Sequence, residues 1–220
     1  MLNTIITNTV LFLRSLFSKN IIVKTKLQDR TTYTLNKKYH RESGPALEYT
    51  DGEKHWYING IPHREGGPAK EYTNGDKFWY LHGVRHREDG PAMEFTNGNK
   101  YWYLNDKLHR EDGPAIEYTN GSKYWYLNGK RHRKNGPAVE YANGGKFWYL
   151  HGELHREDGP AAKWANGVKH WHLNGKLHRE NGPAVEFADG YKQYWVNGKS
   201  LDFITSDQML IYYLKYGFLK

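Results

Sequence analysis

Hydrophobic and polar residues alternate along pairs of short runs, and each pair is separated by an Asn-Gly or Asp-Gly dipeptide. In the first example the runs are residues 45–50 and 53–58, with Asp51-Gly52 between them. Alternation with a period of two is typical of a β-strand with one apolar face. Asn-Gly or Asp-Gly between such runs indicates a hairpin, because a type I′ turn needs positive φ at both central residues. The pattern therefore predicts a β-hairpin with a two-residue turn, and Asn59-Gly60 closes its second strand.

The hairpin pattern recurs with a period of 23 residues. A His-Arg pair starts at seven equally spaced positions, and Gly-Pro-Ala follows each pair at a fixed interval. The seven histidines are His40, His63, His86, His109, His132, His155 and His178. Trp recurs at the same spacing from Trp56 to Trp171, and Tyr194 takes that position in the last copy, with Trp195 one residue later. An unbroken period predicts stacked repeats whose terminal copy is atypical.

A two-residue turn also predicts the two faces of each hairpin. It would pair residue 49 with 54 and residue 47 with 56. We therefore expect one face, the core face, to carry Leu47, Tyr49, Lys54, Trp56 and Ile58. The other would carry Ala46, Glu48, Thr50, His55 and Tyr57, so that recurring glutamates run beside a tyrosine ladder. That ladder is the candidate binding surface for a partner, and it consists of Tyr57, Tyr80, Tyr103, Tyr126 and Tyr149.

The two ends differ from the repeats. Apolar residues have roughly helical spacing over residues 1–23, but Arg14 and Lys19 interrupt them, so the apolar run is too short for a transmembrane helix and lacks the features of a signal peptide. At the other end, Ser206 is a candidate N-cap for a helix over residues 207–216 that stops at Gly217. Because repeat arrays need protected edges, we expect both ends to act as caps.

These patterns predict an all-β fold, an elongated array or solenoid of seven stacked 23-residue β-hairpin repeats with short helical caps at both termini. The organisation would be a basic amphipathic segment at 1–39, the array at 40–200 and a capping helix at 201–220. A single-layer sheet cannot leave its Trp ladder in water. The array must close into a solenoid, bury the ladder under a helix or dimerise through it.

Composition narrows the function classes. The 220 residues include no cysteine, which excludes disulfides, a thiol nucleophile and Cys-based metal sites and favours an intracellular location. The net charge of +8 would suit a nucleic-acid-binding protein. However, residues 1–39 hold seven basic groups against one acidic group, while residues 40–199 hold 23 against 21. The excess positive charge therefore belongs to the N-terminal segment, and the repeats are nearly neutral.

The repeat unit resembles the MORN (membrane occupation and recognition nexus) repeats, and more closely their variant class. The resemblance is carried by segments such as residues 113–118 and 123–130, with Gly before the first strand and Trp-Tyr-Leu-Asn-Gly-Lys in the second, and it covers residues 40–200. The His-Arg-Glu-Asp-Gly-Pro-Ala units are also similar to repeat families of giant DNA viruses that infect amoebae. The resemblance implies a twisted antiparallel sheet of hairpins that acts as a scaffold, a dimerisation surface or a membrane-associated module. A viral origin would imply the host cytoplasm.

Catalytic and metal sites are not expected. Equivalent histidines of stacked hairpins would lie roughly 10 Å apart, because each repeat adds two strands about 4.8 Å wide, and this is too far to share a metal ion. His-Arg-Glu contains acid–base residue types, but it recurs in six copies, with Lys134 replacing Glu in the fifth. The simpler interpretation is a ladder in which each Arg meets a Glu of its own or the next unit. We predict no enzyme activity, no cofactor and no small-molecule substrate.

The leading hypothesis is a scaffold that recruits another protein, or a second copy as a homodimer, through the face with tyrosines and glutamates. The first alternative is peripheral membrane association through a basic N-terminal helix, whose candidate contacts are Arg14, Lys19, Lys24 and Lys26. The second alternative is nucleic-acid binding by aromatic and basic side chains. It is the least favoured, because the repeats offer no continuous positive groove.

Overall fold

The computed structural model describes residues 21–201, and residues 1–20 and 202–220 lie outside the described part. Every regular element between residues 21 and 201 is a β-strand, which confirms the all-β array of stacked hairpins. The C-terminal helix predicted after residue 201 and Arg14 and Lys19 of the N-terminal one lie outside the described residues. Over residues 21–201 the chain forms no helix with the length and hydropathy needed to cross a bilayer.

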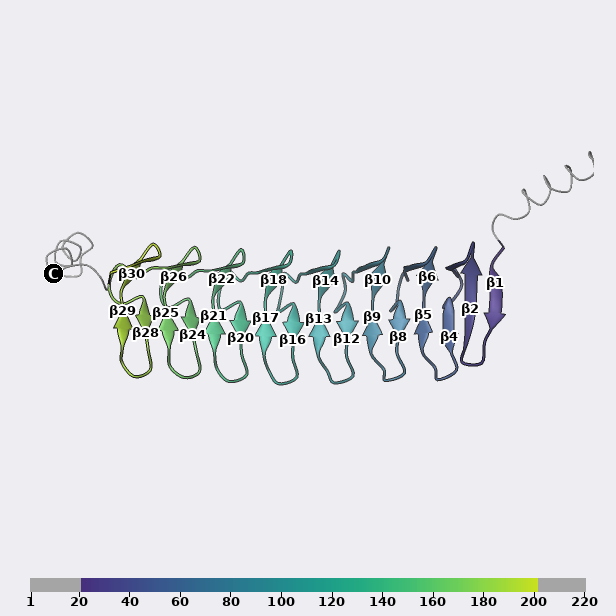
Figure 1. Cartoon of the computed structure of the whole chain (residues 1–220), viewed down its shortest axis with the longest axis horizontal. Coiled ribbons are helices and arrows are strands. Elements are labelled where there is room, and N and C mark those ends of the chain that lie inside the picture. Colours follow the sequence, from purple (N-terminus) through teal and green to yellow (C-terminus); the bar gives the residue numbers. More distant parts are fainter. Residues whose placement is uncertain (1–20, 202–220) are drawn as a thin grey trace, which may run out of the picture. The chain divides into compact units, whose positions relative to one another are not determined.

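The chain forms two compact units, which we describe one at a time (Figure 1). Of the described residues, unit 1 contains 21–96 and 104–106, and unit 2 contains 97–103 and 107–201. The strands up to the end of repeat three are β1 (Val23–Lys26), β2 (Arg30–Leu35), β3 (Lys38–Tyr39), β4 (Leu47–Tyr49), β5 (Lys54–His55), β6 (Tyr57–Ile58), β7 (Ile61–Pro62), β8 (Lys70–Glu71), β9 (Lys77–Phe78), β10 (Tyr80–Leu81), β11 (Val84–Arg85), β12 (Met93–Glu94), β13 (Lys100–Tyr101), β14 (Tyr103–Leu104) and β15 (Lys107–Leu108). Repeats one to seven begin at the seven histidines of the His-Arg pairs.

The later repeats use the same four short strands each. These strands are β16 (Ile116–Glu117), β17 (Lys123–Tyr124), β18 (Tyr126–Leu127), β19 (Lys130–Arg131), β20 (Val139–Glu140), β21 (Lys146–Phe147), β22 (Tyr149–Leu150), β23 (Glu153–Leu154), β24 (Ala162–Lys163), β25 (Lys169–His170), β26 (His172–Leu173), β27 (Lys176–Leu177), β28 (Val185–Glu186), β29 (Lys192–Gln193), β30 (Trp195–Val196) and β31 (Lys199–Ser200).

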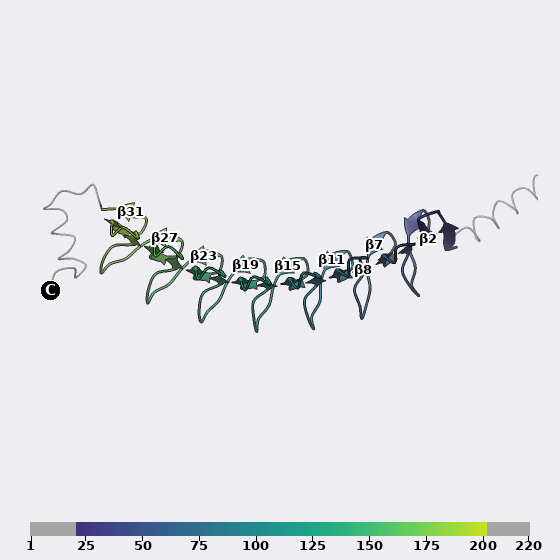
Figure 2. The same ribbon diagram turned by 90° about the horizontal axis from the view of Figure 1, so that it is seen from below.

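Each repeat contributes one hairpin to a main antiparallel sheet and one to a row of small hairpins. In unit 1 the main sheet runs β1–β2–β4–β5–β8–β9–β12, and in unit 2 it runs β13–β16–β17–β20–β21–β24–β25–β28–β29. Small hairpins such as β6–β7 and β18–β19 are separate two-stranded sheets. Within each unit they form a second row beside the main strands, as the labels β7, β11, β19 and β23 show in Figure 2.

The first turn of each repeat is one residue longer than predicted, so the predicted hairpin register is wrong. Leu47 pairs with His55, whereas a two-residue turn would have paired it with Trp56. The same shift recurs in later repeats, where Val139 pairs with Phe147.

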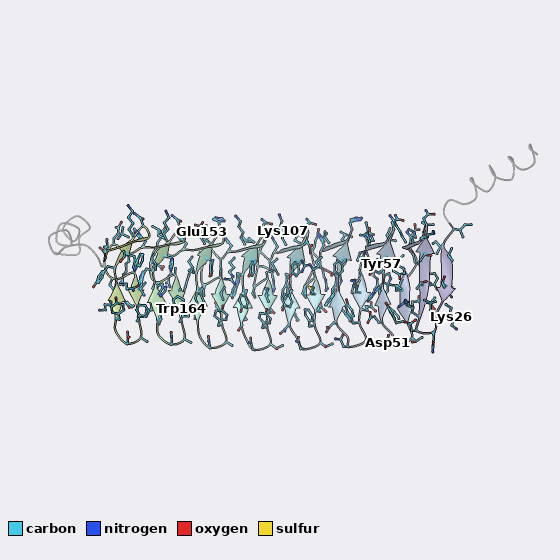
Figure 3. All side chains as sticks on the ribbon, in the orientation of Figure 1. Lys26, Asp51, Tyr57, Lys107, Glu153 and Trp164 are labelled. Carbon is cyan, nitrogen blue, oxygen red and sulfur yellow. The ribbon has the colours of Figure 1, made fainter. Side chains whose placement is uncertain are left out.

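The geometry of this turn explains the shift. The Gly52 amide donates to the Tyr49 carbonyl at 3.1 Å, and the Tyr49 amide donates to the Glu53 carbonyl at 2.9 Å. Gly52 has a φ of +99°, but Asp51 does not adopt a positive φ. This is a type I turn followed by a left-handed glycine, the usual three-residue hairpin loop. The loop projects from the main strands, with Asp51 at its tip (Figure 3).

The second turn of each repeat is the two-residue type I′ turn. Ile58 pairs with Ile61 across Asn59 and Gly60, whose φ angles are +54° and +82°. Asn is the best side-chain-bearing residue for a left-handed position, which accounts for its recurrence here. The type I′ prediction is therefore wrong for Asp51-Gly52, and the turn that needs two positive φ angles is Asn59-Gly60.

The longer first turn regroups the side chains. Residues that pair directly point to the same side of a sheet, so Leu47 and Tyr49 share a face with His55. Tyr57 lies on this side too, with its ring centroid 6.3 Å from that of His55. We call this the aromatic face and define it by the positions of Tyr49, His55 and Tyr57 in each repeat.

The opposite face, here called the Trp face, is defined by the positions of Glu48, Lys54 and Trp56. Glu48 pairs directly with Lys54. The prediction that the recurring glutamates and the tyrosines of the Tyr57 position share a face is therefore wrong. Alternation within each strand was assigned correctly, but a register shift of one residue exchanges the faces of one strand relative to its partner.

The alanine of Gly-Pro-Ala is completely buried in each repeat. All seven have no exposed surface: Ala46, Ala69, Ala92, Ala115, Ala138, Ala161 and Ala184. The prediction that placed Ala46 on an accessible face is wrong, because its backbone bonds to strands on both sides. Its amide donates to the His55 carbonyl and its carbonyl accepts from the Tyr33 amide, each at 2.8 Å. The next residue supplies the larger core side chains, such as Val139, which is 1% exposed.

The described part of the N-terminal segment is a strand pair, not a continuation of a helix. Lys24 and Lys26, predicted to lie on a basic N-terminal helix, belong to β1, which pairs with β2. Strand β2 in turn pairs with β4 of repeat one. Residues 23–39 thus extend the main sheet by two strands.

These strands act as a degenerate additional repeat. Tyr33 stands 23 residues before Trp56, and its amide bonds to the Ala46 carbonyl as the Trp56 amide bonds to that of Ala69, both at 2.8 Å. Residues 36–37 stand 23 residues before Asn59-Gly60 and share its positive φ angles. Extending the 23-residue period backwards through the sequence would have revealed this copy.

We expect glycine substitutions at the two turns of repeat one to have different effects. Asp51→Gly should lower the free energy of unfolding by about 1 kcal/mol, because it removes the acceptor for the Glu53 amide, now bonded at 3.1 Å, and loosens a right-handed position. Asn59→Gly should change it by less than about 0.5 kcal/mol, because φ is already positive there. Urea unfolding followed by Trp fluorescence measures both. Equal losses would contradict the assignment of two turn types.

Candidate functional site

The aromatic face carries a ladder of rings in edge-to-face contact. In unit 1 the ladder runs Tyr49, His55, Tyr72, Phe78 and Phe95, with neighbouring centroids 5.1–5.9 Å apart and planes inclined at 63–69°. In unit 2 it runs Tyr101, Tyr118, Tyr124, Tyr141, Phe147, Trp164 and His170, at 4.4–5.9 Å and 61–89°. Such pairs contribute about 0.5–1.5 kcal/mol each beyond the area they bury. The ladder therefore stiffens the sheet.

Part of this ladder remains open to solvent. Tyr141 is 38% exposed and Trp164 36%, and Phe187, which occupies the same Tyr49 position in the next repeat beyond the ladder, is 37% exposed. Trp164 directly follows β24, where the chain enters its hairpin loop (Figure 3). Large aromatic side chains recurring at this exposure form a surface with apolar area to offer a partner.

The tyrosines predicted to face a partner lie on the small hairpins and are half-buried, a class that includes Tyr57, Tyr80, Tyr103, Tyr126 and Tyr149. The pKa of Tyr57 is raised, and burial is the largest of several causes. Its ring centroid is 5.6 Å from that of Tyr39. Arg131 donates to the hydroxyls of Tyr126 and Tyr149 at 3.3 and 3.2 Å. These tyrosines belong to the aromatic face, and their role in binding stays a prediction.

On the Trp face, the Arg of each His-Arg pair stacks on the aromatic residue eight positions earlier. Six guanidinium carbons lie 3.8–4.2 Å from a Trp ring centroid, in the pairs Arg64–Trp56, Arg87–Trp79, Arg110–Trp102, Arg133–Trp125, Arg156–Trp148 and Arg179–Trp171. Arg41 stacks in the same way on Tyr33 at 3.8 Å. This cation–π contact joins each repeat to the one before it.

The same guanidinium explains the spacing of the repeat motif. Arg110 Nη1 donates to Glu117 at 3.0 Å and to the Pro114 carbonyl at 3.3 Å, and Nε donates to Asp112 at 3.0 Å. A Cβ on Gly113 would lie 2.8 Å from its Cζ, so only glycine fits beneath it. The prediction that each Arg meets a Glu of its own or the next unit is confirmed: the Glu belongs to the same unit and lies seven residues later.

Glutamates and lysines alternate across the main strands of the Trp face. In unit 1, Lys54 pairs with Glu48 and Glu71, and Glu71 pairs with Lys77. In unit 2, Glu117 pairs with Lys100 and Lys123. Opposite charges at directly paired positions stabilise a sheet by about 0.2–1 kcal/mol per pair. The alternation keeps most of this face close to neutral.

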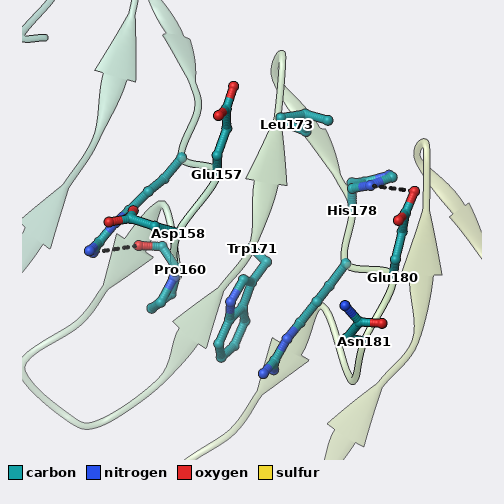
Figure 4. A pocket seen from close by; sticks show the side chains of 11 residues that line it. Glu157, Asp158, Pro160, Trp171, Leu173, His178, Glu180 and Asn181 are labelled. Atoms are coloured by element: carbon teal, nitrogen blue, oxygen red, sulfur yellow. Dashed lines mark hydrogen bonds and ion pairs between the residues drawn. The ribbon is translucent and has the colours of Figure 1, made fainter. Parts of the chain in front are cut away.

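Shallow grooves separate successive repeats on the Trp face. The groove between repeats six and seven has a volume of about 690 Å³, and Trp171 lies between the side chains of the two repeats (Figure 4). Equivalent grooves lie between repeats one and two, two and three, and five and six. Each is lined by the Arg-to-Pro segment of one repeat and by the Trp that follows it.

The histidine of each His-Arg pair has a structural role. Its Nδ1 accepts a hydrogen bond at 3.1–3.3 Å from the backbone amide of the first type I′ turn residue 19 positions later. An Nδ1 that accepts this bond leaves the proton of the neutral imidazole on Nε2. In His86, His109 and His155 the Nδ1 also lies 2.9–3.1 Å from the side-chain oxygen of the Asn at that turn. The turn residue is Asn except at His82 and His151, whose rings contact His63 and His132 with centroids 4.5 Å apart.

The described residues form no cluster of metal ligands. No group of three His, Asp or Glu residues within 21–201 is arranged to hold a metal ion. His170 and His172, two residues apart in the sequence, have ring centroids 6.0 Å apart, and burial lowers the pKa of both.

Two of the four predicted membrane contacts, Lys24 and Lys26, lie within the described residues. Lys24 and Lys26 are exposed on β1, and Lys24 Nζ lies 5.5 Å from the Tyr33 ring. Val23 and Leu27, which flank them, are 53% and 43% exposed. Arg14 and Lys19 lie outside the described residues. The described part of the segment thus combines basic and apolar side chains at the edge of unit 1.

No family model matches the chain, and no curated protein matches it. The function must therefore be argued from the two faces.

Arg110→Ala should lower the free energy of unfolding by about 2 kcal/mol, because it removes a stacked cation and leaves Glu117 without its strongest donor. Arg110→Lys should recover only part of this loss, since an ammonium cannot stack and bridge at once. Lys107→Ala, an exposed position nearby, is the control and should have no measurable effect. Full recovery by lysine in thermal unfolding would contradict the stacking argument.

The stability of the array should fall as the pH drops below about 6.5. Burial, followed by the nearby His151, lowers the pKa of His132 in the folded protein. The unfolded chain therefore takes up the proton first, so stability is lost between the unfolded pKa and the lower folded one. NMR titration of His132 measures this, and His151→Asn should move its pKa back up. A His132 pKa above 6.5 would contradict the prediction.

Proposed function

We propose that this chain is a non-enzymatic repeat scaffold that binds another protein through its aromatic face. The observation that supports it is a recurring exposed aromatic residue: Tyr141 and Trp164 in the edge-to-face ladder, and Phe187 at the same position of the next repeat, keep more than a third of their surface exposed. A single hydrophobic residue on a surface needs no explanation, but a recurring row of large aromatic residues is typical of interaction surfaces. The resemblance to MORN-type repeats and the intracellular setting belong to the same proposal.

The aromatic face suits a protein better than a nucleic acid. Bases bind by stacking on open ring faces. In this ladder the edge of each ring meets the face of the next, for example Tyr124 against Tyr141 at 89°. The rings therefore offer edges and partial faces, which pack against apolar side chains. The cationic side chains of the Trp face lie on the opposite side and alternate with glutamates.

Membrane association is the second candidate, and exposed Lys24 and Lys26 beside exposed Val23 and Leu27 favour it. Basic and apolar side chains together bind anionic lipid surfaces. Co-sedimentation of the full chain with phosphatidylserine vesicles tests it. Lys24→Glu with Lys26→Glu should abolish binding if this edge is responsible, and unchanged binding would reject it.

We expect Tyr141→Lys with Trp164→Lys to abolish partner binding while the fold is retained. The matched control is Ala142→Lys with Ala165→Lys, which adds the same charge to the exposed loops of the same two hairpins. Proximity labelling in cells and purification of the labelled partner provide the binding assay, and circular dichroism checks the fold. If the control variant loses the partner equally, or if the aromatic variant keeps it, the aromatic face is not the binding surface.

A further inference from the structure

The Trp face departs from its repeat pattern in repeat six. In the other six repeats the residue seven positions after the stacked Arg is Glu: Glu48, Glu71, Glu94, Glu117, Glu140 and Glu186. In repeat six it is Lys163, so Arg156 faces a cation where the other arginines meet a carboxylate. Arg156 retains bonds to Asp158 at 2.7 Å and to the Pro160 carbonyl at 3.5 Å.

The exchange brings three lysines together. Lys163 on β24 pairs directly with Lys146 on β21 and with Lys169 on β25. Directly paired side chains have Cβ atoms about 4.5–5.5 Å apart, so these ammonium groups share one side of the sheet. Carboxylates flank the triad without entering it: Glu140 pairs with Lys146, and Glu186 lies 3.4 Å from the Lys169 ammonium. Like charges at paired positions destabilise a sheet.

The adjoining groove has also lost negative charge. The groove between repeats five and six, with a volume of about 970 Å³, has Trp148 in its lining. There, Lys134 and Asn135 replace the Glu-Asp pair found in repeats three, four and six. Arg156 and Lys163 both lie against the Trp148 ring, at 4.2 and 5.6 Å from its centroid. Two separate sequence changes thus remove carboxylates from one region.

The neighbouring groove has more carboxylates than cations in its lining. Between repeats six and seven the lining holds two arginines and three carboxylates: Arg156, Arg179, Glu157, Asp158 and Glu180. Between repeats five and six it holds three cations and two carboxylates: Arg133, Lys134, Arg156, Glu157 and Asp158. The positive region is therefore short, about one repeat wide. A long polyanion such as a nucleic acid would leave it and meet carboxylates, whereas a short acidic peptide segment would not.

We propose that the groove between repeats five and six, together with the triad Lys146, Lys163 and Lys169, binds an acidic segment of the partner protein. The proposal rests on the scaffold function and adds a second contact, on the face opposite the aromatic ladder. Carboxylates of the segment would neutralise the triad and approach Arg156 and Lys163 at the rim of Trp148. Ligand binding would then offset the unfavourable pairing of the three lysines.

The experiment measures binding of a fluorescein-labelled decaglutamate peptide to the full chain by fluorescence anisotropy at 50 mM and 300 mM NaCl. We expect binding at low salt that weakens at high salt, because added ions screen the attraction. Lys163→Glu restores the repeat pattern and should weaken binding at least tenfold, as should Lys134→Glu with Asn135→Asp. Lys107→Glu, an exposed position away from the groove with the same charge change, should bind within twofold of the wild type.

Thermal unfolding gives an independent readout. Lys163→Glu should raise the melting temperature, because the introduced carboxylate would pair with Lys146 and Lys169 and accept a hydrogen bond from Arg156. Lys107→Glu should leave it unchanged. If the melting temperature of Lys163→Glu does not rise, the pairing of the three lysines is not unfavourable.

Three results would overturn the proposal: no binding of decaglutamate by the wild type, an equal loss in Lys107→Glu, or tighter binding of a twenty-nucleotide single-stranded DNA through the same lysines. The scaffold function fails separately, through the aromatic-face variants. If Tyr141→Lys with Trp164→Lys loses the cellular partner and Lys163→Glu keeps it, the scaffold stands and the acidic-segment site does not.

Discussion

The stacked arginine is the contact on which the rest of each repeat depends. One guanidinium lies on the Trp of the preceding repeat, bonds to the carbonyl of its own proline and holds the glutamate on the neighbouring strand, as Arg110 does with Trp102, Pro114 and Glu117. The glycine before the proline is fixed by the same group, since a Cβ at Gly113 would collide with it. The motif His-Arg-x-x-Gly-Pro-Ala thus follows from one side chain that needs room beneath it.

A one-layer sheet has no second layer to cover its faces, and this chain covers them with its own side chains. On the Trp face, arginines cover the indoles and the Glu–Lys ladder balances the charges. On the aromatic face, ring edges cover ring faces from Tyr101 to His170. The core is consequently thin: its fully buried members are mostly alanines. Stability is spread over repeated small contacts, as expected for an array in which each repeat touches only its neighbours.

Regularity makes the exceptions informative. Six equivalent arginines meet a glutamate, so Lys163 is visible as a local departure with a local electrostatic cost. Likewise, exposure of the aromatic face is uneven, and the most exposed rings of the Tyr49 position gather in repeats five to seven, at Tyr141, Trp164 and Phe187. The two observations concern opposite faces of the same repeats. In a repeat protein, binding sites arise where a copy gives up part of the pattern that stabilises the others.

The sequence by itself determined the period, the hairpins, the all-β class and the partnership of Arg with Glu, because these depend on residue types at fixed spacing. It did not determine which residues share a face. That depends on whether the first turn holds two residues or three, and Asp51-Gly52 is compatible with both, since glycine accepts the positive φ of either turn. The strand pairing in the structure shows that this turn holds three residues. Tyr57 therefore shares a face with Tyr49, and Glu48 with Lys54. A register shift of one residue exchanges the two faces of a strand relative to its partner. The local sequence therefore could not assign the faces, and the tertiary structure fixed them.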